Sequence, residues 1–337
     1  MIVRMLAGVL ALAAFAPGWT PQVSGVGATL RGVSTVNDRT AWASGSAGTV
    51  LRTEDGGATW KRVTVPDAMR LDFRDVDAID AHTVYLLSIG NGPASRIYKT
   101  VDAGETWTLQ FQNDDPKVFL DAMSFWDAAH GIVIGDSIAG QFCIMTTADG
   151  GKVWTRVPAS ALPAALPNEG AFAASGTNIA VFGSEEAWIG TGAAATARVL
   201  HTTDRGRTWT VAATPLGAGA SAGIFSIAFR DRQHGVIVGG DYRLEREAVD
   251  NAAVTSDGGH TWTLARGLSG FRSVVAYIPG ERQSLIAVGP QGADVSTDDG
   301  RSWTSMPSPG YHTLSFSRTG PVAFGAGARG AIGRFTR

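Results

Sequence analysis

Short runs of alternating apolar and polar residues, separated by polar turns, recur along almost the whole chain. The stretch from residue 225 to residue 265 shows the unit clearly, with apolar runs at 225–229, 236–239, 252–255 and 261–265. Alternation with a period of two is typical of half-buried β-strands, and no stretch of the sequence shows helical periodicity. The pattern therefore predicts an all-β protein built from a repeated unit of four strands.

An eight-residue motif, here called the box, occurs six times and precedes the last strand of a unit. Its pattern is Ser/Thr-x-Asp-x-Gly-x-(Thr/Ser/Val)-Trp, in the copies TEDGGATW (53–60), TVDAGETW (100–107), TADGGKVW (147–154), TTDRGRTW (202–209), TSDGGHTW (255–262) and STDDGRSW (296–303). The Asp and Ser/Thr side chains can hydrogen-bond within their own turn, and glycine reaches a positive φ without strain. The Trp begins the next strand with a large apolar side chain. We therefore assign structural roles to Asp55, Asp102, Asp149, Asp204, Asp257, Asp298, Trp60, Trp107, Trp154, Trp209, Trp262 and Trp303.

The boxes lie 47, 47, 55, 53 and 41 residues apart when counted from Asp to Asp. Four strands per period of this length are typical of a β-propeller blade. Residues 311–335 repeat the strand pattern but lack a box and a fourth strand. The missing strand is predicted at residues 19–23, because Trp19-Thr20 matches the Trp-Thr found at five of the six boxes. We therefore predict one domain, residues 19–337, folded as a seven-bladed β-propeller of four-stranded antiparallel blades whose ring is closed by the N-terminal strand.

Composition and charge limit the location and the partners of the protein. The net charge of −2 over 337 residues predicts neither a nucleic-acid-binding surface nor a polybasic membrane patch. Residues 1–18 have the pattern of a secretory signal, since Arg4 is followed by an apolar run and by small residues before Trp19. We expect an exported protein, periplasmic or secreted, that is not inserted in a membrane after signal cleavage. Cys143 is the single cysteine, so no internal disulfide is possible.

The boxes resemble the Asp-box (BNR) repeats of sialidases, sortilin-type receptors and xyloglucanases. The seven-unit layout behind a signal segment is most similar to the photosystem II assembly and stability factor family and its relatives in non-photosynthetic bacteria. The resemblance covers almost the whole mature chain. It implies a propeller that binds another protein during assembly of a complex, although this fold serves many functions.

The repeat pattern also assigns loops to the two faces of the ring. In an up-and-down blade the box turn lies on the same face as the turn between the first and second strands. The opposite face is predicted to carry the long insertions, at residues 112–118, 136–140, 158–170, 184–197 and 240–251. Long loops on a rigid scaffold commonly carry function, so the binding site is expected on this face.

Aligning the residues that enter the first strand of each unit predicts which side chains surround the mouth of the central channel. In blade order they are Arg31, Arg74, Leu120, Glu169, Phe225, Arg272 and His312. Because blades six, seven, one and two are neighbours in the ring, the four basic residues are expected along one side. Acidic residues from the insertions are expected on the other side: Asp136, Glu169, Glu185 and Asp241. Such a mouth would bind a carboxylate or phosphate through arginine side chains.

The charged loop 240–251 completes this predicted mouth. It carries Tyr242 and Arg243 and is predicted to cover the channel as a lid that faces a ligand or partner. A structural interpretation stays open for each residue. An arginine before a strand is often a solvated rim residue, and Asp136, Glu169 and Asp241 each adjoin a glycine, as turn-capping residues do.

Catalytic templates fit the sequence poorly. A sialidase needs three arginines for the substrate carboxylate, a Tyr–Glu nucleophile pair and an acidic Asp, but the Phe-Arg-Ile-Pro start of bacterial sialidases is missing. A xyloglucanase uses two carboxylates across a cleft between two propellers, and one propeller is predicted here. The six histidines have no zinc spacing, and the glycine-rich runs precede no helix. We therefore assign no catalytic residue, no metal and no cofactor.

These observations favour an exported propeller that binds another protein or an exported polymer as an assembly or scaffolding factor. We expect a monomer with no nucleic-acid partner. The alternative is a sialidase-like glycoside hydrolase whose site lies at the same mouth, opposite the boxes. A third possibility is a purely structural extracellular module.

Overall fold

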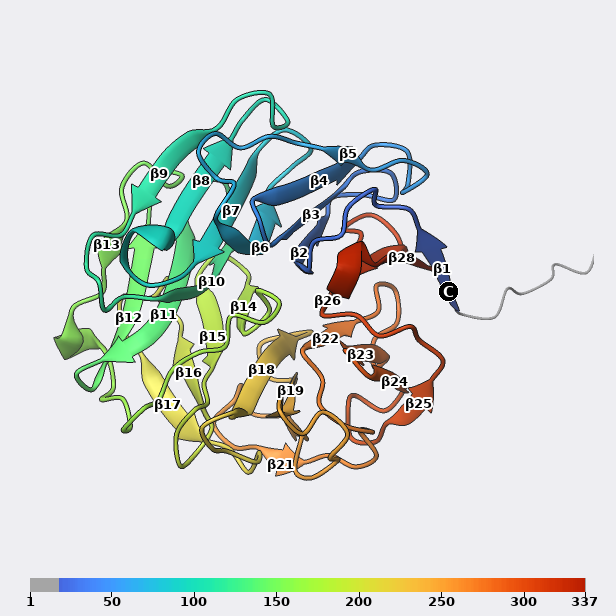
Figure 1. Ribbon diagram of the computed structural model, residues 1–337. Coiled ribbons are helices and arrows are strands. Elements are labelled where there is room, and N and C mark those ends of the chain that lie inside the picture. The colour runs from blue at the N-terminus through green and yellow to red at the C-terminus, as the bar shows by residue number, and fades with distance from the viewer. Residues whose placement is uncertain (1–17, 337) are drawn as a thin grey trace, which may run out of the picture.

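The computed structural model of the protein describes residues 18–336 and consists of seven four-stranded antiparallel sheets arranged in a ring (Figure 1). The first strand of each blade lies next to the central channel, and the later strands follow outward. The predicted all-β seven-bladed fold is therefore confirmed. The expected signal segment, residues 1–18, lies outside the described residues except for Gly18, the first residue of β1.

The strands of the seven blades have the following bounds. Blade 1 contains β2 (Leu30–Thr35), β3 (Ala41–Gly45), β4 (Thr49–Thr53) and β5 (Lys61–Arg62); blade 2 contains β6 (Asp72–Ala78), β7 (Val84–Ile89), β8 (Arg96–Thr100) and β9 (Thr108–Gln112). Blade 3 contains β10 (Leu120–Phe125), β11 (Gly131–Ile138), β12 (Gln141–Thr147) and β13 (Thr155–Arg156); blade 4 contains β14 (Ile179–Phe182), β15 (Glu186–Gly190), β16 (Arg198–Thr202) and β17 (Thr210–Ala213). Blade 5 contains β18 (Ala222–Phe229), β19 (Gly235–Asp241), β20 (Ala252–Thr255) and β21 (Thr263–Leu264); blade 6 contains β22 (Val274–Tyr277), β23 (Leu285–Gly289), β24 (Gly292–Ser296) and β25 (Thr304–Met306). Blade 7 contains β26 (Thr313–Phe316), β27 (Ala323–Ala326), β28 (Ile332–Thr336) and β1 (Gly18–Gln22); short 3-10 turns are η1 (Gly92–Ala94), η2 (Ala159–Ala161) and η3 (Ala328–Gly330).

Blade 7 is closed by strands from the two ends of the chain. Strand β1 pairs antiparallel with β28, and Trp19 stands opposite Phe335 in the register. The Trp19 ring also lies 4.5 Å from the ring of Tyr311 and 5.2 Å from that of Phe335, measured between centroids. The predicted ring closure by residues 19–23 is therefore confirmed, with β1 ending at Gln22.

Each box folds as a turn whose hydrogen bonds are satisfied internally. In the first box, the hydroxyl of Thr53 donates to Oδ1 of Asp55 over 2.8 Å and accepts the N–H of Gly57 over 2.9 Å. The N–H and hydroxyl of Thr59 donate to the two carboxylate oxygens of Asp55 over 2.9 and 2.6 Å. The glycine takes φ between 78° and 90° in all six copies, a region that favours glycine. These contacts explain why six short motifs can each close a hairpin.

The box turns lie on one face of the ring, as predicted. In every box a backbone N–H donates to a carbonyl in the turn between the first two strands of the same blade. The six donors and acceptors are Gly56 to Arg39, Ala103 to His82, Gly150 to Ala129, Arg205 to Glu185, Gly258 to Gln233 and Asp299 to Gln283. The opposite face, here called the mouth face, carries the β7–β8, β11–β12 and β19–β20 connections.

Side chains of the innermost strands join neighbouring blades. Within residues 18–336, a backbone N–H of one blade donates in five places to a side-chain oxygen on the innermost strand of a neighbouring blade, over 2.8 to 3.1 Å. The pairs are Thr35 to Ser315, Ala78 to Ser34, Met123 to Asp75, Phe125 to Asp77 and Val275 to Ser226. Further out, apolar side chains fill the gaps between sheets, as where Trp60 of blade 1 packs edge-on against Phe324 of blade 7. Across residues 18–336 no helix is long and apolar enough to cross a membrane.

Candidate functional site at the channel mouth

Four β-bulges place one residue each at the mouth of the channel. The register between the first and second strands skips one residue at Arg31 in blade 1, Arg74 in blade 2, Asp121 in blade 3 and Phe225 in blade 5. A bulged residue has no partner in the ladder, so its side chain is re-aimed relative to the strand. All four side chains line one cavity.

Residues 171–178, which precede β14, reach into the centre of the ring (Figure 1) and are here called the floor segment, because residues 171–174 line the cavity. Their contacts extend to four other blades. Nη1 of Arg74 donates to the carbonyl of Ala173 over 2.7 Å, and the Ser175 hydroxyl donates to the carbonyl of Ser273 over 2.8 Å. The Phe172 ring stacks on Phe225 with centroids 4.0 Å apart, and the carbonyl of Ser175 accepts the hydroxyl of Thr313 over 3.4 Å. The channel is therefore closed below the mouth.

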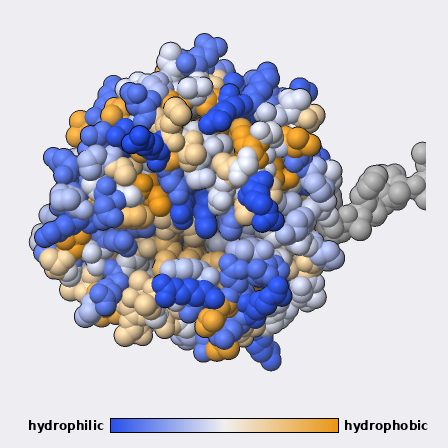
Figure 2. Space-filling model, viewed as in Figure 1, coloured by the Kyte–Doolittle hydropathy of each residue, from blue (hydrophilic) through white to orange (hydrophobic). Residues whose placement is uncertain are grey.

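The cavity above this floor has a volume of about 500 Å³, and Figure 2, viewed down the ring, shows the surface hollowed near its centre. Its walls combine charged and apolar side chains. The lining residues are Arg31, Arg74, Ile89, Phe119, Asp121, Asp136, Ala171, Phe172, Ala173, Ala174, Ala193, Phe225, Tyr242, Glu245, Phe271, Pro290 and His312. A volume of this size is typical of sites that hold a small molecule or a few residues of a peptide.

Arg31 and Arg74, with the uncharged His312 beside them, form the cationic wall of the cavity. Burial, together with the neighbouring Arg74 guanidinium, lowers the pKa of Arg31 to about 10, so Arg31 remains charged near neutral pH. Burial and the two arginines lower the pKa of His312 to about 4, so its imidazole is neutral there. Nε of Arg74 is paired with Asp72 over 2.8 Å, whereas Nε of Arg31 and Nδ1 of His312 have no hydrogen-bond partner within residues 18–336. This wall therefore offers polar atoms that a ligand can satisfy.

Asp121, Asp136 and Glu245 are the acidic residues of the lining. Asp121 is 2% exposed, and its Oδ2 has no hydrogen-bond partner among the described residues. Burial, with the nearby Asp136 carboxylate, raises the pKa of Asp121 well above its ordinary value. Burial also raises the pKa of Asp136, against a hydrogen bond from the backbone of Ala171. The raised pKa favours the protonated form of the Asp121 carboxyl, which can donate a hydrogen bond.

An aromatic wall faces the cavity from blades 5 and 6. Phe271 contacts Phe225 edge-on with centroids 4.6 Å apart, and Tyr242 lies 6.2 Å from both Phe172 and Phe225. Phe225 and Phe271 are almost fully buried, whereas Tyr242 is 42% exposed at the rim. The site thus joins a cationic wall to an apolar one.

The structure brings together five of the residues proposed for the mouth: Arg31, Arg74, His312, Asp136 and Tyr242. Arg272 does not join them. It is 2% exposed, and its guanidinium bonds to Asp294 over 2.6 Å, to the carbonyl of Phe271 and to Ser269. These bonds satisfy Arg272 within the protein, so it supports the blade and leaves the cavity to Arg31 and Arg74.

Glu169 also lies away from the cavity. It is 1% exposed and forms a buried ion pair with Arg198, while the hydroxyl of Thr191 and the N–H of Leu166 donate to its two oxygens. Glu169 does not enter the first strand of blade 4, because β14 begins ten residues later at Ile179. Its contacts instead fix the segment that leads to the floor.

Three further charged residues occupy positions that differ from the expected mouth. Asp241 caps the turn after β19, where its Oδ1 accepts the N–H of Arg243 over 2.8 Å. Arg243 is exposed and its guanidinium lies 5.8 Å from the ring centroid of Tyr242. Glu185 was expected on the mouth face and that placement is wrong, because it belongs to the β14–β15 turn on the box face and its carbonyl accepts the N–H of Arg205.

Several residues of the site are not predicted by aligning the strand entries of the seven units, above all Asp121, Phe172, Phe271 and Glu245. In blade 3 the alignment predicts Leu120 at the mouth, but Leu120 is the residue immediately before the bulge and Asp121 is the bulged residue. Phe172 lies in an insertion with no equivalent in the other blades. Only the short aromatic and alanine run at 171–174 marked that insertion as apolar.

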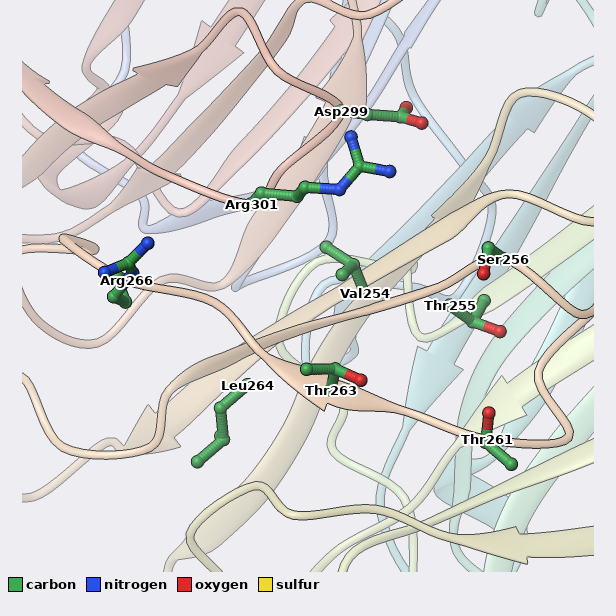
Figure 3. A pocket seen from close by; sticks show the side chains of 9 residues that line it. All are labelled: Val254, Thr255, Ser256, Thr261, Thr263, Leu264, Arg266, Asp299 and Arg301. Atoms are coloured by element: carbon green, nitrogen blue, oxygen red, sulfur yellow. The ribbon is translucent and has the colours of Figure 1, made fainter.

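A second hollow, on the box face between blades 3 and 4, is also lined by ionisable side chains, among them His130, Glu185 and Arg205. The groove shown in Figure 3, about 320 Å³ between blades 5 and 6, is lined by Val254, Thr255, Ser256, Thr261, Thr263, Leu264, Arg266, Asp299 and Arg301. Its Asp299 is already held by Arg230 and by the hydroxyl of Tyr277. Within residues 18–336 no group of three or more His, Cys, Asp or Glu side chains could hold a metal ion.

Comparison with known proteins identifies the class through the fold alone. No family model matches the sequence, and no curated protein sequence matches it. Among solved structures, the chain is similar to YCF48 bound to D1 peptide, with a TM-score of 0.67, 18% identity, and coverage of 96% of this chain and 98% of the other. It is also similar to YCF48 from Cyanidioschyzon merolae, with a TM-score of 0.65, 15% identity and coverage of 94% and 98%.

A GH74 xyloglucanase from Xanthomonas campestris is similar as well, with a TM-score of 0.61 and 17% identity over 94% of this chain but only 53% of the enzyme. The protein is thus a seven-bladed β-propeller whose fold is shared by YCF48 and by part of a GH74 xyloglucanase. At these identities the likeness extends to the architecture, and the function has to be argued from the cavity.

Proposed function

We propose that this chain is an exported propeller that binds another protein at the mouth cavity and acts as an assembly or scaffolding factor in the cell envelope. The observation that carries the proposal is the cationic wall above a closed floor. Arg31 and Arg74 are charged, half-buried and adjacent to an apolar wall, which is a setting in which arginine binds a carboxylate strongly. The signal pattern at residues 1–18 supports export.

The similarity to YCF48 supports a peptide or protein as the occupant, because that propeller is described as bound to D1 peptide. Tyr242, Leu244 and Val249 supply further support. They are 42%, 48% and 67% exposed in the loop beside the cavity, where a protein partner would cover them. An exported polymer with acidic groups is the second kind of partner that this surface could bind.

The experiment is a capture of partners from an envelope extract, comparing the wild type with an Arg31→Gln/Arg74→Gln variant. The matched control is Arg207→Gln/Arg301→Gln, which removes two exposed arginines from box turns on the opposite face. Equal melting temperatures establish equal folding. We expect a protein that is captured by the wild type and the control and lost with the mouth variant. Equal capture by all three, or no specific capture by the wild type, overturns the proposal.

A second candidate, a sialidase-like glycoside hydrolase, is favoured by one observation. Asp121 is a buried carboxylic acid with a raised pKa at a deep cavity, as a general acid requires. Turnover of sialosides or glycans by the wild type and its loss in Asp121→Asn would support this candidate. A screen in which Asp121→Asn and the wild type are equally inactive argues against it.

A further inference from the structure

The mouth cavity has a closed end, which restricts how a polypeptide can enter it. The floor segment 171–178 bonds to Arg74 of blade 2, Ser273 of blade 6 and Thr313 of blade 7, and it stacks on Phe225 of blade 5. A chain segment therefore cannot run through the ring, and only an end or a protruding side chain reaches the cavity floor. The loop around Tyr242 and Glu245 further walls the entrance.

Polar atoms without partners gather in this closed end. Nε of Arg31, Nδ1 of His312 and Oδ2 of Asp121 have no hydrogen-bond partner among residues 18–336, and the Asp121 side chain is almost fully buried. A buried polar group without a partner costs free energy, so these atoms favour a ligand that supplies one. A carboxylate has two acceptor oxygens and matches the guanidinium of Arg31. The Asp121 carboxyl, whose raised pKa favours its protonated form, can donate a hydrogen bond to the same ligand.

The aromatic wall adds a second requirement to the ligand. Phe172, Phe225 and Phe271 present stacked and edge-on rings to the same cavity that Arg31 and Arg74 line. A ligand that leaves this wall in contact with water loses the apolar burial that the wall offers. The best occupant carries a carboxylate and an apolar group close together.

We propose that the cavity receives the C-terminal residue of the partner polypeptide, with its free carboxylate against Arg31, Arg74 and Asp121 and an apolar final side chain against Phe172 and Phe225. This inference rests on the proposed function and names the part of the partner that is bound. A C-terminal residue joins both groups at one Cα, so it satisfies both walls at once. An internal Asp or Glu brings a carboxylate without an apolar group.

The test measures the binding of fluorescein-labelled peptides by fluorescence polarisation near neutral pH. All peptides are based on the sequence Gly-Ser-Gly-Ser-Phe. Four forms are compared: the free acid, the C-terminal amide, the free acid ending in Ser, and an amide with Asp before the final Phe. We expect the free acid ending in Phe to bind about tenfold or more tightly than each of the others, the change that losing one charge-assisted hydrogen bond or one buried ring brings. Equal binding of the acid and the amide, or no binding of any form, overturns the inference.

Variants of the protein test which wall binds the carboxylate and which binds the final side chain. Arg31→Gln is expected to abolish the preference for the free acid, and Phe172→Ala the preference for Phe over Ser, while Arg301→Gln on the box face changes neither. A preference that survives both mouth variants overturns the assignment.

The partner-capture experiment separates failure of this inference from failure of the proposed function. If a captured partner depends on Arg31 and Arg74 but still binds after its C-terminus has been extended by a tag, the protein-binding function stands and the terminal mode is wrong. If no partner is captured by the wild type, the function itself fails.

Discussion

The carboxylate of Asp75 accepts a hydrogen bond from the backbone N–H of Met123 over 2.8 Å, across the junction between blades 2 and 3. Burial raises the pKa of Asp75 to about 7, against the effect of this bond and with a smaller contribution from Asp77. Asp77 accepts the N–H of Phe125 across the same junction, so two titratable side chains belong to the contact that joins these blades.

Asp75 is expected to make the wild-type protein less stable as the pH rises from about 4 to about 7. In that window the folded state holds a proton that the unfolded state has lost, so the free energy of unfolding falls with rising pH. Asp75→Asn keeps an acceptor oxygen for Met123 and removes the titration. Urea unfolding across this range should show the wild type losing on the order of a few kcal/mol relative to the variant. Parallel curves for the two proteins would contradict the assignment.

Removal of a box carboxylate should cost stability without changing binding at the mouth. Asp257 accepts bonds from the N–H and hydroxyl of Thr261 over 2.9 and 2.6 Å, and from the hydroxyl of Thr255 over 2.7 Å. Asp257→Ala is expected to lower the free energy of unfolding by about 2 kcal/mol. Ser256→Ala, an exposed neighbour in the same turn, is the control and should change it little. Lost binding at an unchanged melting temperature would show that this box has a role beyond structure.

The third box lacks one hydrogen bond that the other five possess. Val153 stands where the others have Thr59, Thr106, Thr208, Thr261 or Ser302, whose hydroxyls donate to the box Asp. Val153 is 60% exposed, so its replacement costs little apolar burial. Val153→Thr is expected to stabilise the protein by about 1 kcal/mol through a new bond to Asp149. Thermal melting measures the gain, and Thr106→Val should produce a loss of similar size. A destabilised Val153→Thr protein would refute the prediction.

Ring closure depends on the aromatic contacts of Trp19. Trp19→Ala removes contacts with Tyr311 and Phe335 and is expected to lower the free energy of unfolding by about 3 kcal/mol. Thr20→Ala, an exposed position of the same strand, is the control. Equal chemical unfolding of the two variants would mean that closure rests on backbone pairing alone.

The ion pair between Glu169 and Arg198 should hold the approach to the cavity floor. Glu169→Gln keeps the shape but leaves the Arg198 guanidinium, whose side chain is 12% exposed, without its counter-charge. We expect a loss of about 3 kcal/mol and faster proteolysis between residues 158 and 178. Glu185→Gln, on the box face, is the comparison. Unchanged proteolysis would show that the floor is held by its other contacts.

The fold could be predicted from the sequence because the box is self-contained. Thr53, Asp55 and Thr59 satisfy one another within seven residues, so the same local chemistry recurs wherever the motif occurs. The seventh blade has no box, yet Trp19-Thr20 predicts its outer strand, because these residues match the Trp that ends a box and the Thr that follows it.

The site was less predictable because bulges and long-range contacts decide it. An extra residue in a strand leaves the hydrophobic pattern almost unchanged, yet it moves the cavity-lining position in blade 3 from Leu120 to Asp121. Likewise, nothing near residues 171–178 in the sequence indicates Ser273 or Thr313, which bind that segment from the far side of the ring.

The pairing of Gly18 with Thr336 also sets an order of events during synthesis. Of the strands described, β1 is made first and its partner β28 last. Blades 1 to 6 can form from neighbouring segments as they emerge, while the ends of the ring keep unpaired strand edges until β28 has been made. A chain terminated before Ile332 lacks β28 and cannot close the ring. Premature termination therefore leaves an open, aggregation-prone product even when the first six blades are correctly folded.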